Sequence, residues 1–120
     1  MRFLVCEDDI IISKAIEHRL KKRWLFNRCV ATDGNQASEK VSANEYDLIM
    51  TDLLMPFCSG LELVNKVRND LKLSTPIIVL SRIGNEETII EAFQLGADDY
   101  ISKPFSPNEL SIRVKRFVLI

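Results

Sequence analysis

The sequence predicts an α/β domain built on a parallel β-sheet that is covered by helices on both faces. Five apolar runs of strand length alternate with longer segments of helical periodicity, which is the pattern of repeated strand–helix–strand units. Several of these runs are unbroken, as strands buried on both faces require. The chain has 120 residues, of which 47% are hydrophobic and 28% charged, the usual composition of a globular domain. We therefore expect one domain over residues 1–120.

Each expected strand is one of the apolar runs, and each expected helix follows a strand. The strands are expected at Phe3–Cys6, Cys29–Ala31, Asp47–Thr51, Ile77–Leu80 and Asp99–Ile101. In the first and last helical segments, apolar residues recur every three or four positions and are expected to face the core: Ile12, Ile16, Leu20, Leu110, Val114, Phe117 and Val118. No linker-like or low-complexity tract interrupts this pattern, so no internal domain boundary is expected.

Capping residues predict where four helices begin. Ser59 and Ser106 each open the S-x-x-E pattern of a capping box, and Pro107 takes the first helical position after Ser106. Asp33 and Asn85 are expected to cap the helices that follow the second and fourth strands.

Charge and cysteine content exclude several classes of function. Sixteen Lys and Arg against 17 Asp and Glu give a net charge of -1, which argues against direct nucleic-acid binding driven by bulk positive charge. The three cysteines and the single histidine lack the spacing of a zinc site, so we expect reduced thiols and a cytoplasmic location. No apolar stretch is long enough to cross a membrane, and the N-terminus does not resemble a signal peptide.

Polar side chains follow four of the expected strands. Glu7 and Asp8 follow the first strand, Asp52 the third, Ser81 the fourth and Lys103 the fifth. The carboxyl ends of parallel strands meet at one edge of the sheet, so these groups should converge there. Taken singly, a serine or a lysine at such a position is an ordinary loop residue, and an acid after the first strand is an ordinary helix cap.

Taken together, these residue types indicate phosphoryl chemistry assisted by a divalent metal ion. Clustered carboxylates repel one another and need a cation, and an all-oxygen ligand set suits Mg²⁺. Asp52 lies in an apolar run, where an unpartnered carboxylate is costly, and an aspartate is able to act as a nucleophile that forms an aspartyl phosphate. Lys103 would supply positive charge, and Ser81 a hydrogen bond, to the phosphoryl group.

Four segments, in order along the chain, resemble the receiver domain of response regulators in two-component signalling. They are Phe3–Asp8, Asp47–Pro56 together with Gly60, Pro76–Ser81, and Gly96–Phe105. The resemblance covers the whole chain. It implies a doubly wound (βα)5 flavodoxin-like parallel sheet with strand order 2-1-3-4-5.

The resemblance also implies roles for the acidic residues. Asp52 matches the residue that accepts the phosphoryl group. Asp8 matches a direct Mg²⁺ ligand, and Glu7 a residue that acts on the ion largely through water. Leu54 matches the position whose backbone carbonyl completes the metal site, where an aliphatic side chain is acceptable.

The remaining positions of the pattern concern the phosphoryl group and the switch. Lys103 matches the lysine that contacts the phosphoryl group, and its peptide bond to Pro104 is expected to be cis. Ser81 matches the switch hydroxyl and Tyr100 the switch aromatic. Phosphorylation is then expected to draw Ser81 towards Asp52 and Tyr100 inward, which changes the face formed by helix 4, strand 5 and helix 5.

The implied partner is a histidine kinase or a phosphotransfer protein, and the chain is expected to catalyse only its own phosphorylation and dephosphorylation. Whether a DNA-binding output domain belongs to a longer chain stays open. So does a homodimer through helix 4, strand 5 and helix 5, for which Asp98, Asp99, Glu109 and Arg113 are present. The acidic fourth helix, with Ile89 at a position that is basic in dimerising relatives, departs from that arrangement.

Two further departures concern the phosphorylation pocket. The residue after the switch hydroxyl is usually small, whereas here it is Arg82, a long cation at the pocket rim. Leu54 and Ile83 are aliphatic at positions where many receivers carry polar side chains that help water reach the phosphoryl group. We therefore expect slow autodephosphorylation.

Two other functions are compatible with this fold class. A flavodoxin-like electron carrier would need a Ser/Thr/Gly-rich phosphate loop after the first strand, where this chain has Glu7-Asp8-Asp9. A metal-dependent phosphohydrolase would need a general acid and a substrate cap, for which the sequence offers no obvious residues.

Overall fold

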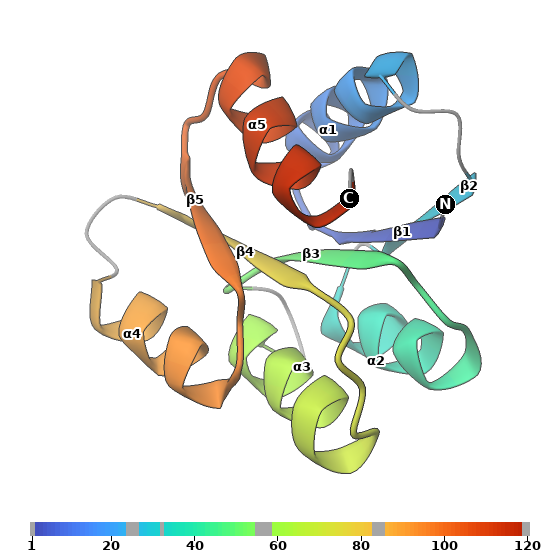
Figure 1. Ribbon diagram of the computed structural model, residues 1–120, viewed down its shortest axis with the longest axis vertical. Coiled ribbons are helices and arrows are strands. Elements are labelled where there is room, and N and C mark those ends of the chain that lie inside the picture. The colour runs from blue at the N-terminus through green and yellow to red at the C-terminus, as the bar shows by residue number, and fades with distance from the viewer. Residues whose placement is uncertain (1, 24–26, 32, 55–58, 83–85, 119–120) are drawn as a thin grey trace.

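The computed structural model describes residues 2–23, 27–31, 33–54, 59–82 and 86–118. Its centre is a five-stranded parallel sheet with strand order β2-β1-β3-β4-β5, which confirms the expected topology (Figure 1). The strands are β1 (Arg2–Cys6), β2 (Asn27–Ala31), β3 (Leu48–Asp52), β4 (Ile77–Arg82) and β5 (Asp99–Lys103).

Helices cover both faces of the sheet. On one face lie α1 (Ile10–Arg23) and α5 (Pro107–Val118); on the other lie α2 (Gly34–Ala43), α3 (Gly60–Asn65) and α4 (Glu86–Leu95) (Figure 1). Among the described residues, no helix combines the length and the apolar character needed to span a bilayer.

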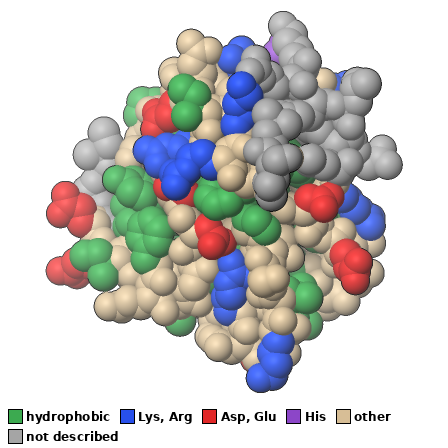
Figure 2. Space-filling view, in the orientation of Figure 1, with side chains coloured by type: hydrophobic (Ala, Val, Ile, Leu, Met, Phe, Trp, Pro, Cys, Tyr) green, Lys and Arg blue, Asp and Glu red, His purple; other side chains and the backbone are tan. Residues whose placement is uncertain are grey.

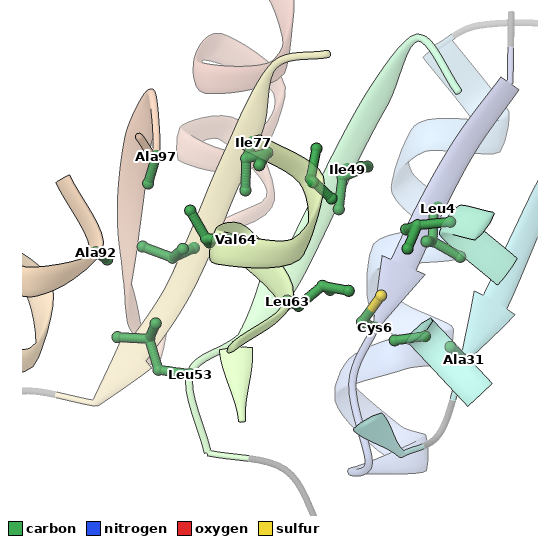
Figure 3. Close-up of a cluster of buried hydrophobic side chains, with 14 residues drawn as sticks. Leu4, Cys6, Ala31, Ile49, Leu53, Leu63, Val64, Ile77, Ala92 and Ala97 are labelled. Carbon is green, nitrogen blue, oxygen red and sulfur yellow. The ribbon is translucent and has the colours of Figure 1, made fainter. Parts of the chain in front are cut away.

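The core consists of two apolar layers, one on each face of the sheet, because successive strand residues point to opposite faces. The layer under α2, α3 and α4 includes Leu4, Cys6, Ile49 and Ile77 (Figure 3). The other layer packs alternate strand residues, such as Val5, against α1 and α5. The residues predicted to face the core from the first and last helices belong to this second layer, with Ile12 and Phe117 partly buried. The side chain of Cys29, and all of Cys58, lie outside the described residues.

Three of the expected helix caps are present. The side chain of Ser59 accepts a hydrogen bond from the amide of Glu62, Ser106 accepts one from the amide of Glu109, and Asp33 accepts one from the amide of Gln36. These bonds satisfy amide groups that the first helical turn leaves without partners. The expected cap at Asn85 lies outside the described residues.

Strands β4 and β5 extend further than their apolar runs predict. The parallel register continues through Ser81 with Ser102 and through Arg82 with Lys103. Backbone pairing does not depend on side-chain polarity, so the ladder continues past the last apolar residue of each run. As a result Ser81 and Lys103 lie within strands, and their positions are set by the sheet and not by loops.

The end of α3 is not a regular α-helical terminus. It continues into a π-helical turn, η1 (Lys66–Asp70), that carries Arg68. The Arg68 guanidinium donates hydrogen bonds to the carbonyls of Leu73 at 2.8 Å and Gly96 at 3.0 Å, and to the Asp98 carboxylate at 2.8 Å. This side chain therefore ties η1 to the turn between α4 and β5.

Gly60 allows α3 to begin directly against the end of β3. A Cβ atom at this position would lie 2.3 Å from the carbonyl oxygen of Asp52 and 2.8 Å from the Cα of Leu53. The Gly60 amide also donates a 3.0 Å hydrogen bond to the Leu53 carbonyl. The absence of a side chain at residue 60 thus determines how closely α3 approaches the carboxyl edge of the sheet.

Substituting Gly60→Ala should lower the free energy of unfolding by about 1–3 kcal/mol, because the new methyl group meets rigid backbone atoms. Urea unfolding followed by circular dichroism measures the change. Asn35→Ala, at an exposed position in the first turn of α2, is the control and should stay within about 0.5 kcal/mol of the wild type. Equal stability of Gly60→Ala and the wild type would show that α3 moves without cost.

Candidate functional site at the carboxyl edge of the sheet

Three acidic side chains converge where β1 and β3 end. Glu7 and Asp8 follow β1, Asp52 is the last residue of β3, and one carboxylate oxygen from each lies within 4.8 Å of the others. Glu7 is fully buried and Asp52 is 8% exposed, whereas Asp8 faces solvent. The arrangement brings together the three acids that the sequence predicts to cluster.

The local structure explains why Asp8, and not its neighbour, is available to the cluster. The carboxylate of Asp9 accepts hydrogen bonds from the amides of Ile11 at 2.9 Å and Ile12 at 3.4 Å, so Asp9 caps α1. The Asp9 amide donates to Glu7 Oε1 at 3.2 Å. The ordinary capping role therefore belongs to Asp9, and Asp8 is left beside Glu7 and Asp52.

Lys103 reaches into the acidic cluster from the end of β5. Its Nζ lies 2.6 Å from Glu7 Oε2 and 2.9 Å from Asp52 Oδ2. Burial alone would lower the pKa of Lys103, but its hydrogen bonds and ion pairs with Glu7 and Asp52 outweigh this and raise the pKa above its usual value. The ammonium group thus stays charged. The peptide bond between Lys103 and Pro104 is cis, as expected.

One ammonium group does not neutralise three carboxylates. Burial, and the nearby charge of Asp52, raise the pKa of Glu7 from 4.5 to about 7, although Lys103 opposes this shift. The Glu7 carboxylate is therefore costly to ionise at neutral pH as long as Lys103 is the only cation beside it.

The acidic cluster is able to hold a divalent metal ion. Glu7 Oε2 is buried, and its one partner among the described residues is the Lys103 ammonium group, 2.6 Å away. A buried carboxylate oxygen with spare lone pairs, next to two further carboxylates, is the donor set that hard divalent cations prefer.

The remaining predicted site residues occupy different positions around the cluster. Ser81 is buried, and its hydroxyl donates to the Arg82 carbonyl at 3.2 Å, so it is not hydrogen-bonded to Asp52. The Leu54 amide donates to Asp52 Oδ1 at 3.3 Å, while its side chain is 62% exposed. Tyr100 is turned to the surface, where its ring packs edge-on against Phe93 with centroids 6.1 Å apart.

A hollow of about 390 Å³ adjoins the cluster between α1 and the segment after β5. It is lined by Ile11, Ile12, Ala15, Arg82, Lys103, Pro104 and Phe105. Except for Arg82 and Lys103 its walls are apolar. The sequence singles out Arg82, but its position directly across from Lys103 depends on the register of β4 and β5, which no local pattern reveals.

Two of the three acids considered for a dimer contact, Asp98 and Asp99, have partners within the chain. Asp98 pairs with Arg68 at 2.8 Å, and Asp99 pairs with Arg113 at 3.0 Å and with Arg116 at 3.2 Å. Figure 2 shows basic, acidic and hydrophobic side chains next to one another over α4, β5 and α5.

Sequence comparisons agree on one family. The profile described as the response regulator receiver domain matches residues 3–115. The transcriptional regulatory protein CrdR of Helicobacter pylori is 34% identical over 97% of this chain, and ResD of Bacillus subtilis is 38% identical over 95% of it. These matches cover 54% and 46% of the two relatives, so the chain spans about half of their length.

Solved structures support the same relationship. The receiver domain of the Francisella response regulator 1452 has a TM-score of 0.87 and 36% identity, covering 97% of this chain and 94% of that one. The chemotaxis response regulator CheY4 of Vibrio cholerae has a TM-score of 0.88 and 30% identity, covering 98% of each chain.

Replacing Glu7 with Gln should make stability less dependent on pH when no divalent cation is present. The folded chain holds the Glu7 proton more tightly than the unfolded chain, because its pKa rises from 4.5 to about 7 on folding. The contribution of this group to stability is therefore complete below pH 4.5 and is lost as the pH rises to about 7. From pH 5 to pH 8, the free energy of unfolding of Glu7→Gln should rise relative to that of the wild type by about 1–3 kcal/mol.

Urea unfolding in EDTA at both pH values measures this difference. Glu39→Gln, which removes an exposed carboxylate of α2, serves as the control and should follow the wild type. Parallel pH profiles for Glu7→Gln and the wild type would contradict the raised pKa of Glu7.

Proposed function

Because this chain belongs to the response regulator receiver domain family, we propose that it accepts a phosphoryl group from a histidine kinase or phosphotransfer protein onto Asp52. The observation that carries the proposal is the contact of one partly buried lysine with two acids at the carboxyl edge of the sheet. Lys103 Nζ lies 2.9 Å from Asp52 and 2.6 Å from Glu7, so the carboxylate is held beside a positive charge.

The proposed reaction is a transfer in which Asp52 is the nucleophile. A carboxylate oxygen of Asp52 bonds to phosphorus as the bond from phosphorus to the donor atom breaks, and the donor leaves with that bonding pair. The positive charge of Lys103 stabilises negative charge on the phosphoryl oxygens. The Leu54 amide, 3.3 Å from Asp52 Oδ1, orients the carboxylate.

We propose Mg²⁺ as the ion that this reaction requires. Glu7, Asp8 and Asp52 would hold it, together with the backbone carbonyl of Leu54. When bound, the ion would neutralise the acidic cluster and polarise the phosphoryl group. The high pKa of Glu7 supports this assignment, because a second cation removes the cost of ionising a buried carboxylate.

The output would be a change of the face formed by α4, β5 and α5. Ser81 is hydrogen-bonded to the Arg82 carbonyl and not to Asp52, and Tyr100 is exposed, so neither side chain is in the position proposed for it after phosphorylation. The chemistry modifies the protein itself, and the receiver is in this sense a switch and not an enzyme with an external substrate. A cytoplasmic location fits this role.

The recipient of the signal would be an output domain or a partner outside residues 1–120. CrdR and ResD are named transcriptional regulatory proteins and are about twice as long as the matched region. A DNA-binding domain linked to the receiver is thus a natural output. A homodimer through α4, β5 and α5 would need contacts beyond Asp98 and Asp99, which are paired within the chain.

Incubation with acetyl phosphate and Mg²⁺ should place one phosphoryl group on the chain at Asp52. Intact mass and peptide mapping after borohydride reduction measure the site. Asp52→Ala should show no label because the nucleophile is missing. Asp33→Asn keeps a capping side chain at α2, and as the control it should label like the wild type. Label that persists in Asp52→Ala would overturn the assignment.

Polar substitutions near Asp52 should shorten the lifetime of the phosphoryl group. Leu54 presents an exposed apolar side chain next to Asp52. Ile83 is expected from the sequence to do the same, and it lies outside the described residues. The Leu54→Asn, Ile83→Glu double variant should lose phosphate faster, by about tenfold, which corresponds to ~1.4 kcal/mol of barrier. Loss of ³²P from purified phosphoprotein gives the rate.

Ile112→Asn is the matched control for this experiment, because Ile112 and Leu54 are both 62% exposed and Ile112 lies on α5. Its phosphoryl lifetime should equal that of the wild type. Equal lifetimes for all three proteins would mean that apolar cover does not limit hydrolysis.

A further inference from the structure

Arg82 and Lys103 lie directly opposite each other at the carboxyl edge of the sheet. Arg82 is the last residue of β4, and its Cα pairs with that of Lys103 at the end of β5. Leu80 and Ile101, two residues earlier on each strand, belong to the core layer under α1 and α5. Because side chains alternate along a strand, Arg82 and Lys103 point to that same face, where both line the 390 Å³ hollow.

The two cations differ in their partners. Lys103 is held by Glu7 and Asp52, whereas the Arg82 side chain is exposed and makes no hydrogen bond or ion pair within the described part of the chain. Like charges that face each other across neighbouring strands are unfavourable. An anion that lies between them would turn this unfavourable pair into a favourable one.

We propose that the Arg82 guanidinium binds an oxygen of the phosphoryl group that is transferred to Asp52. This inference rests on the proposed function and adds a phosphoryl-binding residue to it. A guanidinium group is suited to this role, because it is always charged and presents paired donors that match phosphate oxygens.

The charge balance of the site supports the proposal. With a divalent cation bound, the three carboxylates and Lys103 give a site of zero net charge. Transfer of a phosphoryl group replaces the single negative charge of Asp52 with a dianionic acyl phosphate, which leaves one negative charge in excess. Arg82 supplies the positive charge that balances it, and before transfer the same charge attracts the anionic donor.

A purely steric role for Arg82 predicts the opposite result. If this side chain only narrows the mouth of the hollow, shortening it opens the route to Asp52, and Arg82→Ala should label faster than the wild type. If Arg82 binds the phosphoryl group, Arg82→Ala should label more slowly. Because Arg82 is exposed, neither result should be complicated by unfolding.

The experiment compares Arg82→Ala and Arg82→Lys with the wild type at saturating Mg²⁺. For labelling by acetyl phosphate, we expect Arg82→Ala to raise KM by about tenfold, and Arg82→Lys to lie between this variant and the wild type because it keeps the charge but not the paired donors. Calorimetric titration with beryllofluoride, which imitates the acyl phosphate, should show a loss of affinity of about the same size. Lys21→Ala removes one exposed positive charge near the far end of α1 and should behave like the wild type.

Unchanged or faster labelling of Arg82→Ala, together with unchanged beryllofluoride affinity, would overturn the role of Arg82 while leaving the proposed function intact. Failure of the wild type to label at Asp52 would remove the proposed function, and this inference with it.

Discussion

The ion pairs of Lys103 with Glu7 and Asp52 join the ends of three strands at one point. A buried carboxylate is unfavourable unless a positive charge lies close to it. Here the end of β1 and the end of β3 each place a carboxylate, Glu7 and Asp52, in a buried position. Lys103, at the end of β5, reaches both at 2.6 Å and 2.9 Å. These contacts do not prevent the pKa of Glu7 from being raised, so the cluster is held together although its carboxylates outnumber its one ammonium group. The proposed divalent cation would relieve this imbalance.

The surrounding scaffold keeps these groups in place with backbone features. Asp9 caps α1 and so frees Asp8, and Gly60 lets α3 start against the carbonyl of Asp52. The parallel ladder extends to Arg82 and Lys103, which fixes their side chains on the face covered by α1 and α5. The functional groups therefore lie on strands or at strand ends, so the backbone atoms that carry them move little unless the sheet itself moves.

Features encoded by local patterns could be predicted from the sequence, whereas contacts between distant segments could be predicted only where topology implies them. Asp33, Ser59 and Ser106 cap helices as expected, because a cap depends on residues within one turn. Lys103 and Asp52 are 51 residues apart, but parallel strands place their carboxyl ends together, so this contact was also expected. The bond of Arg68 to Asp98, across 30 residues, has no such topological signature. Neither does the π-helical turn that presents Arg68.

The pairing of Asp98 and Asp99 within the chain has a consequence for the face formed by α4, β5 and α5. An intermolecular salt bridge to Asp99 would compete with Arg113 and Arg116, which already contact it at 3.0 Å and 3.2 Å. Asp99 is buried, so an intermolecular pair would have to replace contacts that already neutralise a buried carboxylate, and the exchange yields little net free energy. Apolar contacts carry no such cost, and this face exposes Ile90 and Phe93 on α4 beside Tyr100. Because the rings of Phe93 and Tyr100 touch, an inward rotation of Tyr100 would remove that contact and change the apolar surface of the face without breaking the Asp99 ion pairs.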